Sequence, residues 1–215
     1  MESVKQMLYG VAMELGRRER KKQQTKQAIS DVATTLFLER RFDAVTVAEV
    51  ARAADVAVQT VFNHFPAKED LFFDEAGWWR GPARAIRAAP PDADPVDVLE
   101  RQYLAETRDR LEVGHLATWK QFVRTIEGSP ALLARRRLTA DELETSLTEA
   151  LDERSPDHLR NRLIAALYAA AQKVLEERLM TVLPDDAAPE ELTSAQTELE
   201  QAIAQVFAVL RRGLA

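Results

Sequence analysis

The sequence contains no cysteine, so disulfide bonds and thiolate metal sites are excluded. Its three histidines, His64, His115 and His158, are scattered and do not have the spacing of metal ligands. No apolar run approaches the roughly 20 residues that a membrane helix needs. Phosphate loops, nucleophile elbows and metal-ligand clusters are also missing. We therefore expect a cytoplasmic protein that is not an enzyme, has no cofactor or metal, and does not bind membranes.

Glycine is scarce as well, with 7 residues in 215, and no strand pattern is visible. Ala, Leu, Glu and Arg, which favour helices, are abundant. Hydrophobic residues make up 46% of the chain, which is enough to bury a substantial core. This composition predicts an all-α fold with about nine helices.

Positive charge is concentrated near the N-terminus, although the net charge is −6. Residues 16–30 carry six Lys and Arg against one Glu, whereas residues 81–215 carry 17 basic and 23 acidic residues. A basic arm on an acidic body suggests that the arm meets a polyanion, or alternatively that it is only a solvated tail. We predict a flexible arm over residues 1–24. The candidate basic contacts in and beside it are Arg17, Arg18, Lys21, Lys22 and Lys26.

Residues 46–65 contain two very short apolar helix patterns joined by a tight turn. Thr46 and Glu49 have the spacing of a capping box, which starts the first helix. Asp55 lies in the turn, where a left-handed backbone conformation is expected. Helices this short are not stable alone, so tertiary packing must justify them. Packed on a longer helix over residues 25–40, they form a helix-turn-helix, whose second helix fits the DNA major groove.

The second short helix has one face predicted to point inward and one predicted to face DNA. Val58, Val61 and Phe62 are the predicted core positions. Gln and Asn side chains can pair with adenine, and Thr can meet a polar base edge or a thymine methyl. The predicted outward positions are Ala57, Gln59, Thr60 and Asn63. Taken singly, each of these is better explained as an ordinary surface residue, and only the spaced set together with the basic arm favours DNA binding.

Three further residues are candidates for contacts with phosphate. The helix N-terminus at Thr46 can receive an anion. Lys68 and His64 lie near the start of the next helix. The basic arm could follow the backbone or enter the minor groove.

Residues 25–72 resemble the DNA-binding domain of the TetR (tetracycline repressor-like) family of transcriptional regulators. The resemblance rests on Thr46-Val47, Val50-Ala51, Ala54-Asp55-Val56, Val58 with Thr60-Val61-Phe62, His64-Phe65, Lys68-Glu69 and Leu71. It implies a homodimer, a palindromic double-stranded DNA operator, a C-terminal domain over residues 73–215 that senses a small molecule, and a tendency toward repression.

The sequence departs from the family pattern at four positions. Asp55 stands where the turn usually has Gly, and Ala57 stands where a Ser or Thr cap is common. Phe62 replaces a Tyr whose hydroxyl touches phosphate, and Ala67 replaces a small polar cap. These changes affect phosphate contacts and caps rather than the fold, and they suggest that the basic arm carries more of the DNA affinity than usual.

The last two predicted helices have wide apolar faces with many small residues. Two such helices from each chain would form a four-helix bundle in a homodimer. The alternative is that both helices only cover their own core. A two-fold dimer would place two recognition helices about 34 Å apart, one turn of DNA. The candidate dimer residues are Leu163, Leu167, Ala170, Val174, Leu199, Ile203, Val206, Phe207 and Leu210.

Aromatic residues in the middle helices are candidates for an effector cavity, although most aromatics at such spacing are core. An aromatic cavity would suit a hydrophobic or planar compound. Binding would favour the DNA-incompetent state and release the operator. The candidates are Tyr103, Trp119, Phe122 and Tyr168, with His115 or Arg124 as polar contacts.

Two other readings remain open at this point. A helical interaction or membrane-surface protein would use the basic arm but leave the Thr46–Leu71 geometry unexplained. A helical enzyme is the least favoured.

Overall fold

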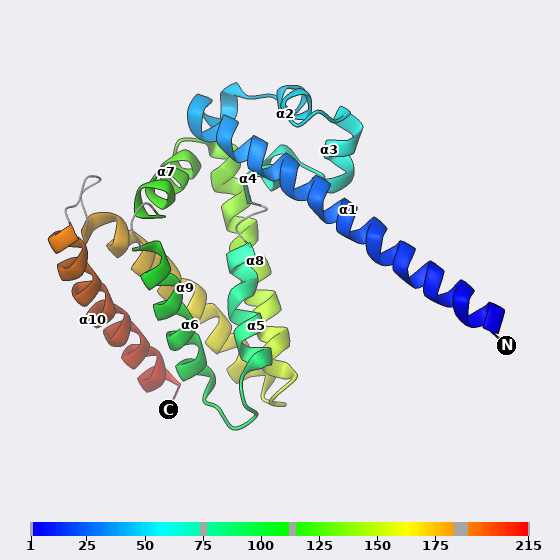
Figure 1. Cartoon of the computed structure of the whole chain (residues 1–215). Helices are drawn as coiled ribbons and strands as arrows, with labels where there is room; N and C mark the ends of the chain where they lie inside the picture. The colour runs from blue at the N-terminus through cyan, green and yellow to red at the C-terminus, as the bar shows by residue number, and fades with distance from the viewer. Residues whose placement is uncertain (1, 74–76, 112–114, 183–188, 215) are drawn as a thin grey trace. The chain divides into compact units, whose positions relative to one another are not determined.

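A computed structural model of the chain describes residues 2–73, 77–111, 115–182 and 189–214. Side chains are described from residue 18 onward within these ranges, except at 77, 78, 115 and 189–191. The described residues form ten α-helices and two 3-10 helices without any strand, which confirms the all-α prediction (Figure 1). The chain divides into two compact units, Met1–Ala76 (the N-terminal unit) and Gly77–Ala215 (the C-terminal unit).

The N-terminal unit packs three short helices against one long helix. Phe37, Phe42 and Phe72 form an aromatic cluster at its centre, with ring centroids 4.9 to 6.2 Å apart. Fully buried residues from each helix complete this core and include Ile29, Ala33, Val50, Val61 and Leu71. The elements are α1 (Glu2–Arg40), η1 (Phe42–Ala44), α2 (Val47–Ala53), α3 (Val58–His64) and α4 (Lys68–Phe73).

Helix α1 begins at Glu2, so the helix start predicted at Thr25 is wrong. The Thr25 hydroxyl donates to the carbonyl of Lys21 at 3.0 Å and therefore does not cap a new helix. Residues 17–24 are all Arg, Lys, Glu or Gln, which are strong helix formers. Glu19 and Lys22 also form an ion pair at 4.0 Å along the helix. The basic segment therefore continues the helix that carries the core residues.

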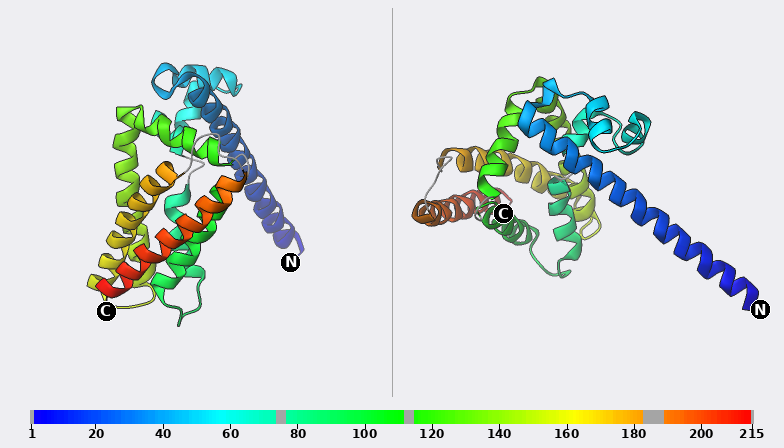
Figure 2. Two further views of the ribbon diagram at one scale, coloured as in Figure 1. Left: turned by 90° about the vertical axis from the view of Figure 1, so that its left-hand side faces the viewer. Right: turned by 45° about the horizontal axis from the view of Figure 1, so that its top comes forward.

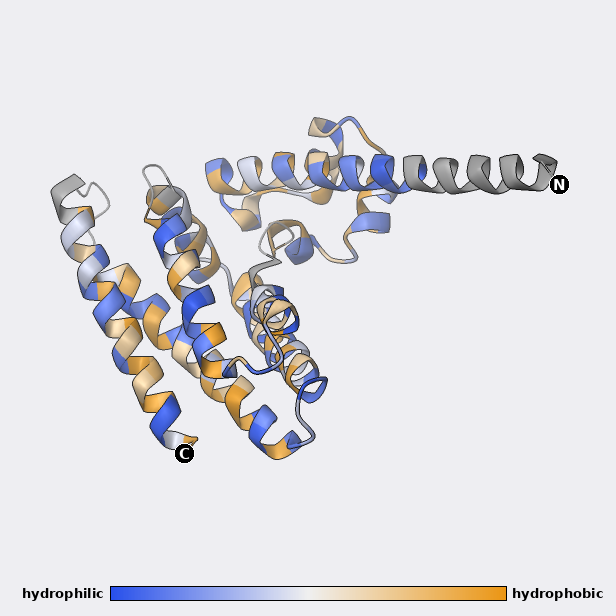
Figure 3. Ribbon diagram, turned by 60° about the horizontal axis from the view of Figure 1, so that its bottom comes forward, coloured by the Kyte–Doolittle hydropathy of each residue, from blue (hydrophilic) through white to orange (hydrophobic). Residues whose placement is uncertain are grey.

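The C-terminal unit is a bundle of six α-helices. Helix α8 packs on both α5 and α9, and α10 lies alongside α6 and α9, as two views agree (Figure 2). Apolar and polar residues alternate along α10, as expected for a helix with one buried face (Figure 3). The elements are η2 (Gly77–Arg80), α5 (Gly81–Ala88), α6 (Pro95–Arg110), α7 (His115–Glu127), α8 (Pro130–Asp152), α9 (His158–Val182) and α10 (Pro189–Gly213).

The proline-containing loop between α5 and α6 is held by a single arginine. The Arg154 guanidinium donates to the carbonyls of Ile86 and Pro90, both at 2.7 Å, and to that of Ala93 at 3.1 Å. These bonds join the last turn of α5 to the loop that follows it. Asp94 then caps α6 by accepting from the Val96 amide at 2.8 Å. This loop is therefore fixed to the end of α8.

Candidate nucleic-acid interface and effector region

The predicted capping box at the start of α2 is present. Thr46 Oγ1 accepts from the Glu49 amide at 3.2 Å, and Glu49 Oε2 accepts from the Thr46 amide at 2.8 Å. Arg40 at the end of α1 adds an ion pair to Glu49 at 2.7 Å. These hydrogen bonds, led by that from the Thr46 backbone, lower the pKa of Glu49 to about 2. The start of α2 is thus fixed to α1 through one carboxylate.

The turn between α2 and α3 has the left-handed residue that the sequence predicts. Asp55 has a φ of 52°, a conformation that only a minority of non-glycine residues adopt. The Val56 amide donates to the carbonyl of Ala51 at 2.9 Å and closes the end of α2. Helix α3 can therefore start within three residues of Asp55 and cross α2 at a sharp angle.

Helix α3 buries one residue of the predicted apolar face and exposes the other two. Val61 is fully buried, as predicted, but Val58 is 41% and Phe62 43% exposed. The prediction that both face the core is therefore wrong. Val58 and Phe62, four positions apart, share a strip of the helix that flanks the buried Val61.

The predicted DNA-facing residues of α3 lie mainly on its exposed side. Gln59 and Asn63 are exposed, and Gln59 Nε2 donates to Asn63 Oδ1 at 3.1 Å. Ala57 is exposed at the start of the helix and makes no side-chain cap, as its missing hydroxyl implies. Thr60 is half-buried. The amide pair is thus held in place on the helix surface before any ligand binds.

Lys68 makes an intramolecular contact that the sequence did not predict. Its ammonium donates to the carbonyl of Phe42 at 2.6 Å and lies 4.0 Å from the centroid of the Phe42 ring. Burial lowers its pKa. This geometry gives Lys68 a structural role in joining α4 to η1, whereas its contact with phosphate stays a prediction. Asp70 accepts from the Ala67 amide at 3.1 Å, which is one half of a capping box, whereas Ala67 has no side-chain oxygen to form the other half.

The basic residues of α1 differ in their surroundings. Arg18, Lys21 and Lys22 are exposed, whereas Lys26 is half-buried with its ammonium 5.5 Å from the Phe65 ring centroid. His64 is also half-buried and lies beside Phe65. The remaining candidate, Arg17, has a side chain outside the described residues.

Two predicted effector residues belong to a buried polar network in the C-terminal unit. The Tyr168 hydroxyl donates to Gln102 Oε1 at 3.0 Å, and Gln102 Nε2 donates to Glu106. Tyr103 is 3% exposed and lies beside Phe207, which also contacts Tyr168. Burial raises the pKa of Tyr103 to about 12, and it also raises the pKa of Tyr168 well above its ordinary value.

Two carboxyl groups in this region of the C-terminal unit are buried, and their pKa values are raised as a result. Burial raises the pKa of Glu106 on α6 and of Glu176 on α9. Arg110 lies 3.5 Å from Glu106, and Arg136 lies 3.8 Å from Glu176. Sequence reasoning missed Gln102, Glu106 and Arg110, although their spacing of four residues marks a polar stripe on one side of α6.

The remaining effector candidates differ in how deeply their side chains are buried. Trp119 packs against the apolar cluster around Leu116 and Leu179, with the Arg110 guanidinium 5.8 Å from its ring centroid. Phe122 is half-buried, but Arg124 is exposed and is therefore poorly placed to line an interior site. The side chain of His115 lies outside the described residues.

The predicted dimer residues separate into a buried and an exposed set. Leu163 and Val174 are 46% and 55% exposed, Ala170 is exposed, and Leu167 and Val206 are half-buried. The prediction is wrong for four residues of α10 that fill the core of their own unit and cannot form a surface. These are Leu199, Ile203, Phe207 and Leu210.

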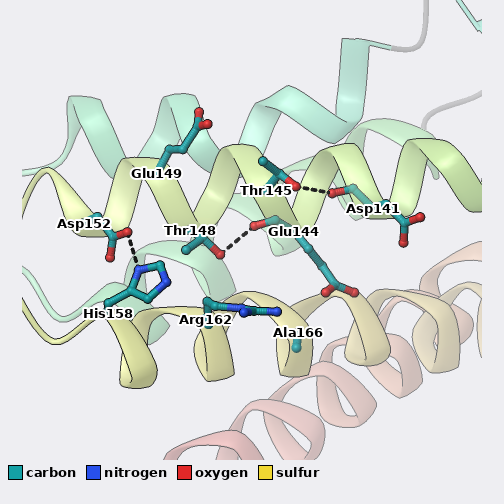
Figure 4. A pocket seen from close by; sticks show the side chains of 9 residues that line it. All are labelled: Asp141, Glu144, Thr145, Thr148, Glu149, Asp152, His158, Arg162 and Ala166. Atoms are coloured by element: carbon teal, nitrogen blue, oxygen red, sulfur yellow. Dashed lines mark hydrogen bonds and ion pairs between the residues drawn. The ribbon is translucent and has the colours of Figure 1, made fainter.

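A surface groove of about 400 Å³ lies between α8 and α9 (Figure 4). Four carboxylates, together with His158 and Arg162, line it, and His158 Nδ1 lies 2.7 Å from Asp152. None of the predicted effector residues lines this groove. Among the side chains that are described, no group of three or more His, Asp or Glu is placed to hold a metal ion. No described helix is long and apolar enough to span a membrane.

An all-α chain whose first unit contains a helix-turn-helix with an exposed polar recognition face has the architecture of a DNA-binding regulator. Residues 29–74 match the model of the family described as bacterial regulatory proteins, tetR family. The chain is 29% identical over 174 residues to the HTH-type transcriptional regulator TcmR of Streptomyces glaucescens, covering 74% of this chain and 75% of that protein.

Solved structures share the fold at lower identity. NalD of Pseudomonas aeruginosa, the secondary repressor of the MexAB-OprM multidrug efflux pump, matches 86% of this chain and 97% of its own, with a TM-score of 0.56 and 19% identity. A TetR transcriptional regulator from Rhodococcus sp. RHA1 matches 87% and 97%, with a TM-score of 0.51 and 17% identity. The N-terminal unit therefore carries the DNA-binding domain described for the tetR family, and the chain is similar over most of its length to a helix-turn-helix transcriptional regulator.

Proposed function

We propose that the chain is a ligand-responsive repressor that binds a palindromic operator as a homodimer. The observation that carries this proposal is the exposed face of α3, on which Gln59 and Asn63 are held together at 3.1 Å. An amide at this position can donate to N7 and accept from N6 of adenine in the major groove. The exposed cations Arg18, Lys21 and Lys22 on α1 would supply contacts with phosphate.

The homodimer would form through the exposed apolar side of α9. Leu163, Ala170 and Val174 lie on this side, whereas Ile164 and Leu175 on the opposite side are buried in the unit's own core. Leu159 and Val209, which are 81% and 58% exposed, extend the surface along α9 and α10. A second copy of these two helices would cover the surface as a four-helix bundle.

The effector would bind beside the network of Gln102, Glu106 and Tyr168. Tyr103 and Trp119 supply flat apolar surfaces, while Glu106 supplies an acceptor that burial has already desolvated. A planar aromatic compound with a hydrogen-bond donor matches this combination. Binding that favours the DNA-incompetent state would release the operator.

The experiment that tests this function is selection of bound sequences from random duplex DNA at physiological salt. We expect one palindrome, whose affinity falls with added salt and which anionic vesicles do not displace. Recovery of no preferred sequence, both from the purified protein and after unfolding and refolding to remove a bound effector, would contradict DNA recognition.

The dimer is tested separately by sedimentation. Leu163→Glu combined with Val174→Glu is expected to give a monomer, because a charge would be buried in the interface. Leu138→Glu is the matched control, since Leu138 is an equally exposed leucine, at 57%, but lies on α8. A double variant that stays dimeric would exclude this face of α9 from the interface.

The effector site is tested by release of labelled operator. A panel of planar aromatic hydroxy compounds should contain members that release it from the wild type. Glu106→Gln and Tyr168→Phe should weaken this release without changing operator affinity. If both variants respond as the wild type does, the effector binds elsewhere.

A further inference from the structure

Two large apolar side chains stand exposed on the recognition helix. Among the described side chains of the N-terminal unit, Val58 and Phe62 are the only large hydrophobic residues that are exposed, at 41% and 43%. Single exposed apolar residues are common on protein surfaces and need no explanation. Here, however, both lie on one seven-residue helix, four positions apart, and so form a continuous apolar strip.

This strip lies directly beside the amide pair. Gln59 follows Val58 and Asn63 follows Phe62, so each apolar residue has a polar neighbour on the exposed side of α3. The two pairs run parallel along the helix, and the buried Val61 lies opposite Gln59 and Asn63, with Val58 and Phe62 on the flank between them. A groove that admits the whole helix, as the major groove of DNA does, can therefore contact both pairs at once.

The major groove offers one apolar group to such a strip. Each base pair presents hydrogen-bond donors and acceptors there, and only thymine adds a methyl group. Phe62 has no hydroxyl with which to bind a phosphate, so its contribution to binding must come from apolar contact. An amide pair suited to adenine and an apolar strip suited to thymine together match adjacent A·T base pairs.

We propose that Val58 and Phe62 determine operator specificity by contacting thymine methyl groups next to the base pairs that Gln59 and Asn63 contact. This inference rests on the proposed function, because it requires that α3 enters the major groove. It adds that the half-site contains thymine at positions whose recognition depends on the methyl group and not on a hydrogen bond.

The direct test leaves the protein unchanged and removes one methyl group at a time from the DNA. After selection of the operator, each thymine is replaced in turn by deoxyuridine, which lacks the methyl group but pairs identically. Burial of one methyl group corresponds to about a fourfold change in affinity. We expect about fourfold weaker binding at one or two positions, and about 16-fold when such a position is changed symmetrically in both half-sites.

A variant cycle assigns the methyl contact to the strip. Phe62→Ala or Val58→Ala should bind the thymine and deoxyuridine operators equally at the position concerned. Gln59→Ala is the matched control on the same helix and should keep the full preference for thymine. Phe62→Leu, which preserves bulk, guards against a folding defect, and circular dichroism melting confirms that each variant is folded.

The outcomes separate this inference from the function on which it rests. A selected palindrome that binds equally with thymine and deoxyuridine at every position would overturn the methyl contact and leave the regulator function intact. A thymine preference that survives in the Val58 and Phe62 variants would assign the contact to other residues and also overturn the inference. Recovery of no preferred sequence would overturn both.

Discussion

The N-terminal and C-terminal units place their carboxylates in opposite surroundings. Glu49 lies at the surface of the N-terminal unit, where hydrogen bonds from Thr46 and Arg40 lower its pKa to about 2. Glu106 and Glu176 lie inside the C-terminal unit, where burial raises their pKa. One unit uses ionised groups to fix short helices, whereas the other keeps desolvated polar groups in its interior.

This difference follows the expected tasks of the two units. A surface that meets DNA must hold its geometry before binding, and local caps and turns achieve that at low cost. An interior that meets a small molecule gains from polar groups whose hydrogen bonds water does not already satisfy.

The largest expected effect is the loss of a core aromatic residue. Phe37→Ala in the N-terminal unit and Phe207→Ala in the C-terminal unit should each lower the free energy of unfolding by about 3–5 kcal/mol, because both side chains are fully buried. Urea unfolding followed by hydrogen exchange in each unit measures this. If each substitution destabilises only the unit that contains it, the two units unfold independently. If either substitution destabilises both units equally, they unfold together and the division is contradicted.

The amide pair should affect DNA binding without affecting the fold. Gln59→Ala or Asn63→Ala should weaken binding of the selected operator by about 1–3 kcal/mol and relax the preference at one base pair. Titration of labelled operators that differ at single positions measures this. A uniform loss across all sequences would mean that these side chains contact the backbone and not the bases.

Lys68 should affect the fold as well as DNA binding. Lys68→Met removes the charged hydrogen bond to Phe42 and should cost about 1–3 kcal/mol in the free energy of unfolding of the N-terminal unit. Lys22→Met, which removes an exposed lysine of α1, is the control and should leave stability nearly unchanged. If neither variant changes the free energy of unfolding, Lys68 has no structural role and only its proposed contact with phosphate is left.

The smallest expected effect is a difference in pH dependence between the units. The folded pKa of Glu49 lies below its ordinary value of 4.5, so its stabilisation is complete above about pH 4.5 and is lost as the pH falls toward about 2. The folded pKa of Glu106 is raised, so the C-terminal unit loses stability as the pH rises from 4.5 through that pKa.

Glu49→Gln should remove the first dependence and Glu106→Gln the second. Hydrogen exchange in each unit between pH 2 and pH 7 measures both. Parallel pH profiles in the two units would show that the two kinds of carboxylate do not differ as the structure indicates.

Elements whose signals lie within a few residues of one another could be predicted from the amino-acid sequence. The capping box of Thr46 and Glu49, the left-handed turn at Asp55 and the short helices on either side were all predictable, because caps and turns depend on neighbouring residues. The same holds for Gln59 and Asn63, whose spacing alone places them together on one helix face.

The tertiary structure decided which apolar residues are buried and which polar residues meet. Their spacing predicts that Val58 and Phe62 are core residues, but both are exposed because α3 packs on its neighbours through Val61. Four apolar residues of α10 that were predicted to form a dimer surface are instead buried in the core of their own unit. Glu106 and Tyr168 are joined through Gln102, although 62 positions separate them in the chain. Periodicity shows that a helix has an apolar face, but only its neighbours in space determine what that face contacts.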